Sequence, residues 1–353
     1  MSSETIELTE LPGFESPEPR RELQPGHFIE RGTQRRLMLF AGRSHPELAA
    51  KIGKHLGVDC GEVTLKTFAN GEAYCRFEES IRGADVFLLQ TGCAPVDTHL
   101  MELLFMIQAA KLGSAKRITA VMPLFPYARQ DRKARPREPI SARLVADFLQ
   151  TAGADRVLTM DLHAGQIQGF FNIPVDHMIA LPLFANHFRS QGFAGNEIVS
   201  VSPDPGRAKM AVKFGEMLDA PFAIMHKTRP EHDTAEVTEV TGRVRGKIAV
   251  MGDDRIDTGG TLIAGARALR AQVAEAVYVF ATHGIFAGDA LERLGEADEV
   301  DAIAVTDTVP IDPLRRPDKV TVVSVSSLLA ETIWNVFSDE SVSAIFAGEN
   351  QLF

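Results

Sequence analysis

The sequence predicts an α/β protein with two domains, each a mainly parallel sheet flanked by helices, and three observations support this prediction. Short apolar segments of strand length alternate with segments of helix length from Arg36 onward. The alternation resumes in the second half of the chain, where it repeats a pattern from the first half. With 353 residues, the chain is long enough for two or three domains. Such alternation is typical of parallel strands whose connecting helices cover both faces of a sheet.

The first predicted domain spans residues 37–178, and we expect its boundary with the second near residues 175–185. Short apolar runs are interpreted as strands, and the longer segments between them as helices. The predicted strands are 35–42, 85–92, 117–125 and 156–163, and the predicted helices are 45–57, 99–113 and 141–153.

The second predicted domain spans residues 179–346. Its predicted strands are 196–204, 247–254 and 276–283, and its predicted helix is 261–272. Residues 118–123 with 156–163 are similar to residues 247–252 with 276–283, since each pair is a strand, a loop, a helix and a strand that ends in His. This similarity indicates either a duplicated domain or a chance likeness between buried strands.

The two ends of the chain are expected to lie outside these domains. The first 36 residues carry four prolines, many charges and little periodicity, so they bury too little apolar surface to offset the entropy cost of ordering. We therefore expect residues 1–36 to be a flexible extension; the alternative is a segment that covers the surface of a subunit. Residues 347–353 form a short tail.

The composition argues against a general nucleic-acid or membrane-surface binder. Lys and Arg number 37 and Asp and Glu 47, a formal charge of −10, so an anionic partner must meet a local group of cations. The cysteines Cys60, Cys75 and Cys93 form no C-x-x-C pair, so neither a disulfide framework nor a cysteine zinc site is expected. No apolar run reaches the roughly 18 residues of a membrane span, and the first residues lack a secretion signal. We therefore expect a soluble cytoplasmic protein.

The strongest motif is Val250–Thr261, VMGDDRIDTGGT, in which an apolar strand ends on two carboxylates and turns into a helix. Glycines let backbone N–H groups approach a phosphate, and a helix N-terminus favours the anion. The carboxylates of Asp253 and Asp254 suit the vicinal hydroxyls of a ribose. In an open α/β sheet this loop lies at the carboxyl ends of the strands, where ligands bind. The alternative is a plain strand–turn–helix in which Asp257 or Thr258 caps the helix.

This motif resembles the phosphoribosyl-diphosphate signature of type I phosphoribosyltransferases and of ribose-phosphate diphosphokinases, and further motifs favour the second family. The similarity runs from about Leu37 to Phe346. It implies two duplicated type I phosphoribosyltransferase-like domains, and Mg²⁺-dependent transfer of the diphosphoryl group of ATP to ribose 5-phosphate for nucleotide biosynthesis. It also implies a homo-oligomer, specifically a hexamer, with phosphate or ADP as effectors. The ribose 5-phosphate site implied by the resemblance comprises Asp253, Asp254, Asp257, Thr258, Gly259, Gly260 and Thr261.

The segment FANGEAYCRF resembles the nucleotide-binding turn of this family, in which an aromatic ring stacks on adenine. From the residues alone it is a hairpin with an Asn-Gly turn. The two interpretations are compatible, because a hairpin tip can reach the site of a neighbouring subunit. The ATP-binding residues implied here are Phe68, Asn70, Gly71 and Glu72.

A second segment, residues 127–141, resembles the part of the family that contacts ATP through Arg129 and Gln130. It holds five basic residues against one acid between Arg129 and Arg137, in a chain that is acidic overall. Arginine forks suit phosphate oxygens, although such a charge run is often only a solvated surface. The chain has no G-x-x-x-x-G-K-S/T loop, so ATP must be held by other means.

His163 and Asp204 match the Mg²⁺-site histidine and carboxylate of the family, although a lone histidine after a strand is more often structural. Mg²⁺ prefers oxygen ligands, so His163 is expected to act largely through water or nucleotide phosphates. After Asp204 the sequence departs from the family pattern S-P-D-x-G-G with a later Arg. Arg207 stands at the second glycine and Met210 at the arginine. Arg207 and Lys209 are therefore the candidates for the missing charge.

Lys227 and Arg229, in the segment IMHKTRP, match the two cations of the family's catalytic loop. Their implied role is to stabilise charge on the β- and γ-phosphates of ATP. As isolated residues they would be interpreted as surface charges. The resemblance also implies a regulatory phosphate site that includes Ser80, Arg82, Ser341 and Ser343.

Two other classes of function stay open. A catalytically weak regulatory homologue could associate with active diphosphokinase subunits, but such proteins usually lose the catalytic cations or the ribose-phosphate loop, and this chain keeps both. A phosphoribosyltransferase that consumes the diphosphate product would lack the two ATP segments. Release of AMP from ATP and ribose 5-phosphate separates the three possibilities.

Overall fold

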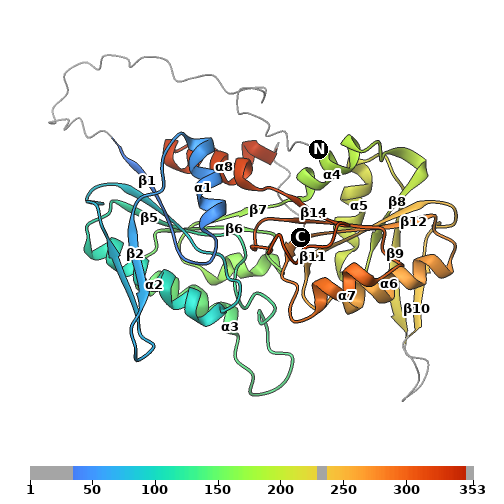
Figure 1. The fold of residues 1–353 in the computed structure, drawn as a ribbon, viewed down its shortest axis with the longest axis horizontal. Helices are drawn as coiled ribbons and strands as arrows, with labels where there is room; N and C mark the ends of the chain where they lie inside the picture. Colours follow the sequence, from blue (N-terminus) through green and yellow to red (C-terminus); the bar gives the residue numbers. More distant parts are fainter. Residues whose placement is uncertain (1–34, 229–236, 347–353) are drawn as a thin grey trace, which may run out of the picture.

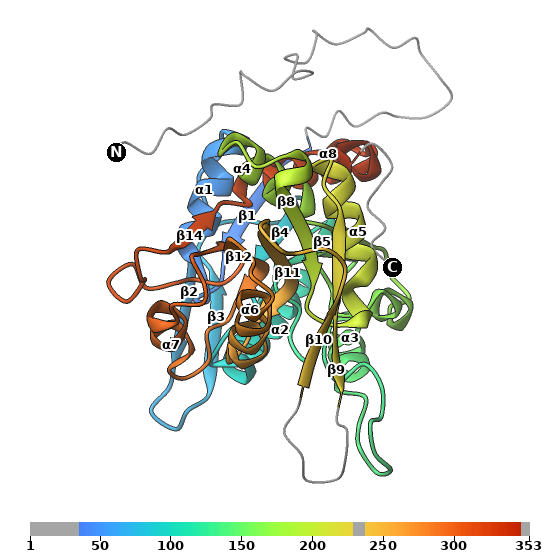
Figure 2. The same cartoon turned by 90° about the vertical axis from the view of Figure 1, so that its right-hand side faces the viewer.

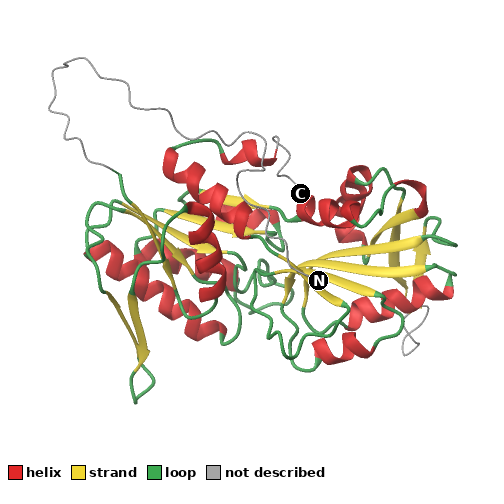
Figure 3. Cartoon of the chain, turned by 45° about the horizontal axis from the view of Figure 1, so that its top comes forward, coloured by secondary structure: helices red, strands yellow, loops and turns green. Residues whose placement is uncertain are grey.

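The structure, a computed structural model, describes residues 35–228 and 237–346. Residues 1–34 of the predicted extension, the catalytic candidate Arg229 and the tail 347–353 lie outside the described residues. The described part contains two sheets dominated by parallel strands, with helices on both faces of each (Figures 1 and 3). This confirms the α/β prediction.

The first sheet is entirely parallel. Its strands, in spatial order, are β1 (Leu37–Ala41), β4 (Asp85–Leu89), β5 (Arg117–Met122), β6 (Arg156–Met160) and β7 (Val175–Met178). The helices that cover it are α1 (Pro46–Leu56), α2 (Val96–Leu112), α3 (Ser141–Ala152) and α8 (Ser326–Ser338). Successive side chains of a strand point to opposite faces. Val86 and Leu88 accordingly join the apolar cluster of α2 and α3, while Phe87 and Leu89 join that of α1 and α8.

A separate antiparallel hairpin, β2 (Val63–Thr67) and β3 (Ala73–Phe77), projects from this half of the molecule (Figure 1). Its turn is closed by hydrogen bonds from Phe68 N to Glu72 O at 2.8 Å and from Gly71 N to Phe68 O at 2.8 Å. Gly71 has φ +92°, a left-handed conformation that costs glycine little. The hairpin predicted from the Asn-Gly pair is therefore confirmed.

The second sheet has seven strands, of which only β10 runs antiparallel to its neighbour (Figure 2). In spatial order they are β10 (Val237–Thr241), β9 (Phe222–Thr228), β8 (Ile198–Ser202), β11 (Ile248–Ile256), β12 (Ala276–Gly284), β13 (Ala302–Thr306) and β14 (Val320–Val323). Its helices are α4 (Leu181–Ser190), α5 (Ala208–Met217), α6 (Gly260–Ala271) and α7 (Ala290–Glu296). The expected boundary near residues 175–185 falls between β7 and α4.

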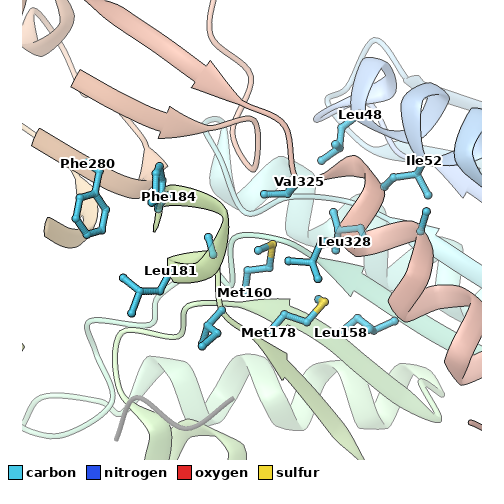
Figure 4. Packing of buried hydrophobic residues seen from close by; sticks show 14 of the residues in the cluster. Leu48, Ile52, Leu158, Met160, Met178, Leu181, Phe184, Phe280, Val325 and Leu328 are labelled. Atoms are coloured by element: carbon cyan, nitrogen blue, oxygen red, sulfur yellow. The ribbon is translucent and has the colours of Figure 1, made fainter. Parts of the chain in front are cut away.

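One apolar core extends from the first sheet to the second (Figure 4). At one end, Leu48 and Ile52 of α1 face Leu328 of α8, and at the other Phe184 of α4 lies against Phe280 of β12, with ring centroids 4.8 Å apart. The last α-helix of the described chain thus returns to the first sheet. This shared core fixes the two sheets relative to each other and so defines the cleft between their carboxyl ends.

Two expectations about composition can be compared with the described residues. None of the helices in the described ranges is long and apolar enough to cross a bilayer. The thiols of Cys60, Cys75 and Cys93 are all free, and burial raises the pKa of each of them. The thiols are therefore poor candidates for reactive groups.

Candidate active site

Two adjacent carboxylates, Asp253 and Asp254, lie near the end of β11, which runs two residues further than predicted, to Ile256. Because side chains alternate along a strand, Asp254 is buried at 6% exposure while Asp253 is half-buried. Burial and the charge of Asp254 raise the pKa of Asp253. Burial also acts to raise the pKa of Asp254, but hydrogen bonding from His163 and the charge of Arg207 outweigh it and hold that pKa below its ordinary value. Asp254 is thus the ionised member of the pair.

The carboxylate of Asp254 contacts a histidine and an arginine. The Nδ1 atom of His163, which follows β6, lies 2.8 Å from Asp254 Oδ2, and Arg207 Nη2 lies 2.6 Å from Asp254 Oδ1. Arg207 Nη2 also lies 3.0 Å from His163 Nδ1. Because an ionised carboxylate only accepts hydrogen bonds, we assign the proton on His163 Nδ1 to the shorter contact with Asp254. The Nε2 atom of His163 is then left to meet a metal ion or a phosphate, as in carboxylate–histidine–metal arrangements.

Asp204 follows β8, the sheet neighbour of β11, by two residues. Its Oδ1 accepts hydrogen bonds from Gly206 N at 2.7 Å and Arg207 N at 3.2 Å, which fixes the turn that carries Arg207. Asp204 and His163 line one cleft. Among the described residues, however, no group of three or more His, Cys, Asp or Glu could hold a metal ion by itself. Two donors fit a Mg²⁺ ion that takes its other ligands from water and phosphate.

The glycine loop leads from β11 into α6 without a side-chain cap. Gly259 is the N-cap residue, with φ +73°, and no side chain caps the helix. The alternative in which Asp257 or Thr258 caps α6 is therefore wrong. The first N–H groups of α6 are left without a side-chain partner, which is the arrangement that favours a phosphate.

We expect Gly259→Ala to destabilise the protein by roughly 1–3 kcal/mol, because a Cβ would be forced into a left-handed conformation. That Cβ would also lie 2.8 Å from Leu294 Cδ1. Gly260→Ala is the matched control, since the nearest atoms to its Cβ are 4.0 Å away. Thermal unfolding of the two variants tests this contrast. Equal melting temperatures for the Gly259→Ala and Gly260→Ala variants would contradict the expected backbone strain of alanine at position 259.

Asp257 connects the loop to the first half of the chain. Its Oδ2 accepts from Arg129 Nη1 at 2.9 Å and from Arg255 Nη2 at 2.7 Å. These three residues border both a charged cleft of about 260 Å³ and a neighbouring, more apolar pocket of about 500 Å³. The pocket is also lined by Leu124, Phe125, Tyr127, Gln130 and Ile285. A charged cleft that opens beside an apolar pocket suits a ligand with a phosphate end and an aromatic end.

The charged cleft brings together nine of the predicted site residues, from both halves of the chain. Those that line it are Arg129, His163, Asp204, Asp253, Asp254, Asp257, Thr258, Gly259 and Thr261. Gly260 follows as the first residue of α6, and Gln130 lines the adjacent pocket. Sequence reasoning missed Arg255 as a site residue, although it stands inside the motif, between Asp254 and Asp257.

The hairpin tip, residues 68–72, lines neither the charged cleft nor the apolar pocket of its own chain. Phe68 is 44% exposed, lies edge-on to Tyr74 at 5.6 Å between centroids, and has Lys66 Nζ 5.4 Å from its ring centroid. The structure of one chain therefore does not bring Phe68, Asn70, Gly71 and Glu72 to Arg129.

The four candidate regulatory residues lie away from the cleft. Ser80, Arg82, Ser341 and Ser343 are all exposed. The guanidinium of Arg36 donates to the backbone oxygens of Ser80 at 3.3 Å and Arg82 at 2.9 Å. Arg35 pairs with Asp339 at the end of α8, close in sequence to Ser341. Contacts of two successive arginines thus place both segments near the start of β1.

The catalytic candidate Lys227 belongs to β9, where its Cα is paired with that of Thr238 on β10. β9 lies next to β8, which ends at Ser202, two residues before Asp204. Arg229 lies outside the described residues.

Comparison with known proteins agrees with this arrangement. Residues 37–153 match the model of the N-terminal domain of ribose phosphate pyrophosphokinase, and residues 233–347 match that of the phosphoribosyl synthetase-associated domain. The chain is 48% identical over 310 residues to the ribose-phosphate pyrophosphokinase of Caldanaerobacter subterraneus, covering 88% of this chain and 98% of the relative. It is 49% identical over 319 residues to that of Corynebacterium glutamicum, covering 90% and 97%.

A solved structure extends the similarity to three dimensions. The crystal structure of phosphoribosylpyrophosphate synthetase from Mycobacterium smegmatis superposes with a TM-score of 0.82 at 49% identity, covering 86% of this chain and all of the other. The two sheets are accordingly two phosphoribosyltransferase-like domains. With relatives of nearly half-identical sequence along almost their whole length, this chain belongs to the ribose-phosphate pyrophosphokinase family.

Proposed function

We propose that this chain transfers the diphosphoryl group of ATP to the anomeric hydroxyl of ribose 5-phosphate, giving 5-phosphoribosyl 1-diphosphate and AMP for nucleotide biosynthesis. One observation carries the proposal: the cleft that holds a carboxylate pair and a glycine loop adjoins an apolar pocket bordered by Arg129 and Gln130. The carboxylates accept from ribose hydroxyls, the start of α6 binds the 5-phosphate, and the pocket takes the adenosine of ATP.

In this reaction the anomeric hydroxyl releases its proton to solvent and its oxygen bonds to the β-phosphorus of ATP, while the bond from that phosphorus to the oxygen bridging to the α-phosphate breaks. AMP leaves with the bridging oxygen, and no enzyme nucleophile is required. Positioning and charge neutralisation therefore supply the catalysis. Asp253 and Asp254 orient the sugar. The side chains of Lys227 and Arg229 stabilise the negative charge that develops on the diphosphoryl group as it is transferred. Arg129 exchanges its contact with Asp257 for a phosphate of ATP.

Mg²⁺ is the cofactor in this proposal. His163 Nε2 and the free oxygen of Asp204 are the donors that the chain offers from the two sides of the cleft. When bound, the ion neutralises negative charge on the phosphates of ATP. The hydrogen bond from His163 Nδ1 to Asp254 keeps the ring in the tautomer that this role needs.

The exposed hairpin supports an oligomer in which ATP is bound between two copies. Phe68, Asn70, Gly71 and Glu72 of one copy complete the apolar pocket of the next, so that the ring of Phe68 stacks on adenine. We propose a homo-oligomer, a hexamer, in the cytoplasm. Phosphate or ADP acts as an effector at Ser80, Arg82, Ser341 and Ser343.

The test is a product assay with purified protein, Mg²⁺, ATP and ribose 5-phosphate. We expect AMP and 5-phosphoribosyl 1-diphosphate to form in equal amounts, because the diphosphoryl group moves as one unit. Release of ADP in place of AMP would contradict the proposed function. So would the absence of turnover over a range of phosphate concentrations.

A further inference from the structure

We propose that Arg207 is the residue that positions the Asp253–Asp254 pair for ribose 5-phosphate, by contacting both carboxyl groups from the turn before α5. This inference rests on the proposed function, in which the pair accepts hydrogen bonds from the sugar. Arg207 acts through the two carboxylates and is therefore a positioning residue. Its substitution should weaken the use of ribose 5-phosphate and spare that of ATP.

The guanidinium of Arg207 spans the pair. Its Nη2 lies 2.6 Å from Asp254 Oδ1 and its Nε lies 3.4 Å from Asp253 Oδ1. The side chain of Arg207 is only 15% exposed, and those of Asp253 and Asp254 are 20% and 7% exposed. Arg207 pairs with the ionised Asp254 and also reaches Asp253, so one guanidinium holds the two adjacent carboxyl groups in one orientation.

No other described Lys or Arg side chain forms an ion pair with either carboxylate. Arg255, the nearest cation in sequence, pairs with Asp257 at 2.7 Å. Lys209, the other candidate from the sequence, is exposed. Arg207 therefore contacts both members of the pair, while His163 contacts Asp254 through its other carboxylate oxygen.

Arg207 is itself held in place. Asp204 Oδ1 accepts from the backbone N–H of Arg207 at 3.2 Å, and the following residues start α5. Asp204, which fixes this turn, is a proposed Mg²⁺ ligand, and the side chain of Arg207 extends from the turn to the proposed sugar ligands Asp253 and Asp254. The segment 204–207 thus connects the proposed metal site with the proposed sugar site.

A small cavity of about 30 Å³ beside Arg207 makes position 210 a second place from which a cation can reach Asp254. Met210, 8% exposed on the first turn of α5, lines this cavity together with Asp254, Asp161 and Thr282. Asp161 already accepts from Thr282 Oγ1 at 2.6 Å and from Ala180 N at 2.8 Å. An arginine at position 210 would therefore find Asp254 as its partner within the cavity.

The experiment measures KM for each substrate in three variants. Arg207→Met should raise the KM for ribose 5-phosphate by about 30-fold or more, because the carboxylate pair loses its cation. The KM for ATP should change by less than about threefold, because His163 loses its 3.0 Å contact with Arg207 but keeps its hydrogen bond to Asp254. Arg207→Lys should give an intermediate value, since a point charge cannot span both carboxylates. The exchange variant Arg207→Met with Met210→Arg has the wild-type composition. Its KM for ribose 5-phosphate should be about tenfold lower than that of Arg207→Met.

A second readout keeps folding separate from binding. Ribose 5-phosphate should raise the melting temperature of the wild type and of the exchange variant more than that of Arg207→Met. An unchanged KM for ribose 5-phosphate in Arg207→Met, or equal losses for both substrates, would overturn the proposal. Asp257→Asn, measured in parallel, tests the site itself. If Asp257→Asn leaves the KM for ribose 5-phosphate unchanged, the proposed sugar-phosphate loop is wrong, whatever Arg207 does.

Discussion

Replacing Lys227 with alanine should lower kcat by about a thousandfold while ATP affinity stays within about threefold of the wild type. A cation that meets charge developing on the transferred diphosphoryl group contributes mainly in the transition state, so its loss lowers kcat more than it weakens ground-state binding. β9 carries Lys227 beside the strand that leads to Asp204, which is consistent with this role.

Pre-steady-state and steady-state rates with ATP and ribose 5-phosphate, together with calorimetric binding of ATP, would measure this effect. Lys116→Ala is a suitable control, because Lys116 is an exposed lysine outside the cleft. The role assigned to Lys227 fails if ATP affinity collapses while turnover at saturation persists.

The second large effect is expected for Asp254→Asn, which should lower kcat/KM for ribose 5-phosphate by about a thousandfold. The amide removes a charged acceptor for a sugar hydroxyl, worth roughly 1.5–3 kcal/mol. It also removes the carboxylate that orients His163, a support worth about 10- to 100-fold in metal sites. The Mg²⁺ concentration for half-maximal activity should rise for the same reason.

Asp253→Asn gives the internal comparison. Its carboxylate lies 3.4 Å from Arg207 and makes no described contact with His163, whereas Asp254 contacts both at 2.6 and 2.8 Å. We therefore expect a smaller loss, and no change in the Mg²⁺ requirement. The test is to measure kcat/KM of both variants for ribose 5-phosphate across a Mg²⁺ titration. Equal losses of kcat/KM and equal Mg²⁺ requirements in the two variants would contradict the separate roles given to the two carboxylates.

Local patterns predicted the strands that carry the site with good accuracy. The strand expected at 276–283 is β12, Ala276–Gly284, and the strand expected at 247–254 is β11, Ile248–Ile256. Both are apolar, buried and parallel, so their composition is distinctive. The strands β9 and β10 were not predicted, because β9 ends in the polar segment HKT and β10 is largely polar, VTEVT.

The contacts between strands could not be predicted from local patterns. β8 and β11 are neighbours in the sheet although β9 and β10 lie between them in sequence. This pairing brings Arg207 to Asp254, and nothing in either segment alone indicates it. For the same reason, sequence reasoning could name Arg207 and Lys209 as candidates for a missing cation but could not choose between them.

The return of α8 to the first sheet has a consequence for biosynthesis. Leu328, Leu329 and Ile333 of α8 cover the face on which Leu48 and Ile52 lie, yet α8 is translated after every strand of both sheets. A nascent chain that has emerged only as far as residue 178 would therefore expose an apolar face to solvent and to chaperones. That face is covered only after α8 has been synthesised, so the two halves of this protein mature together.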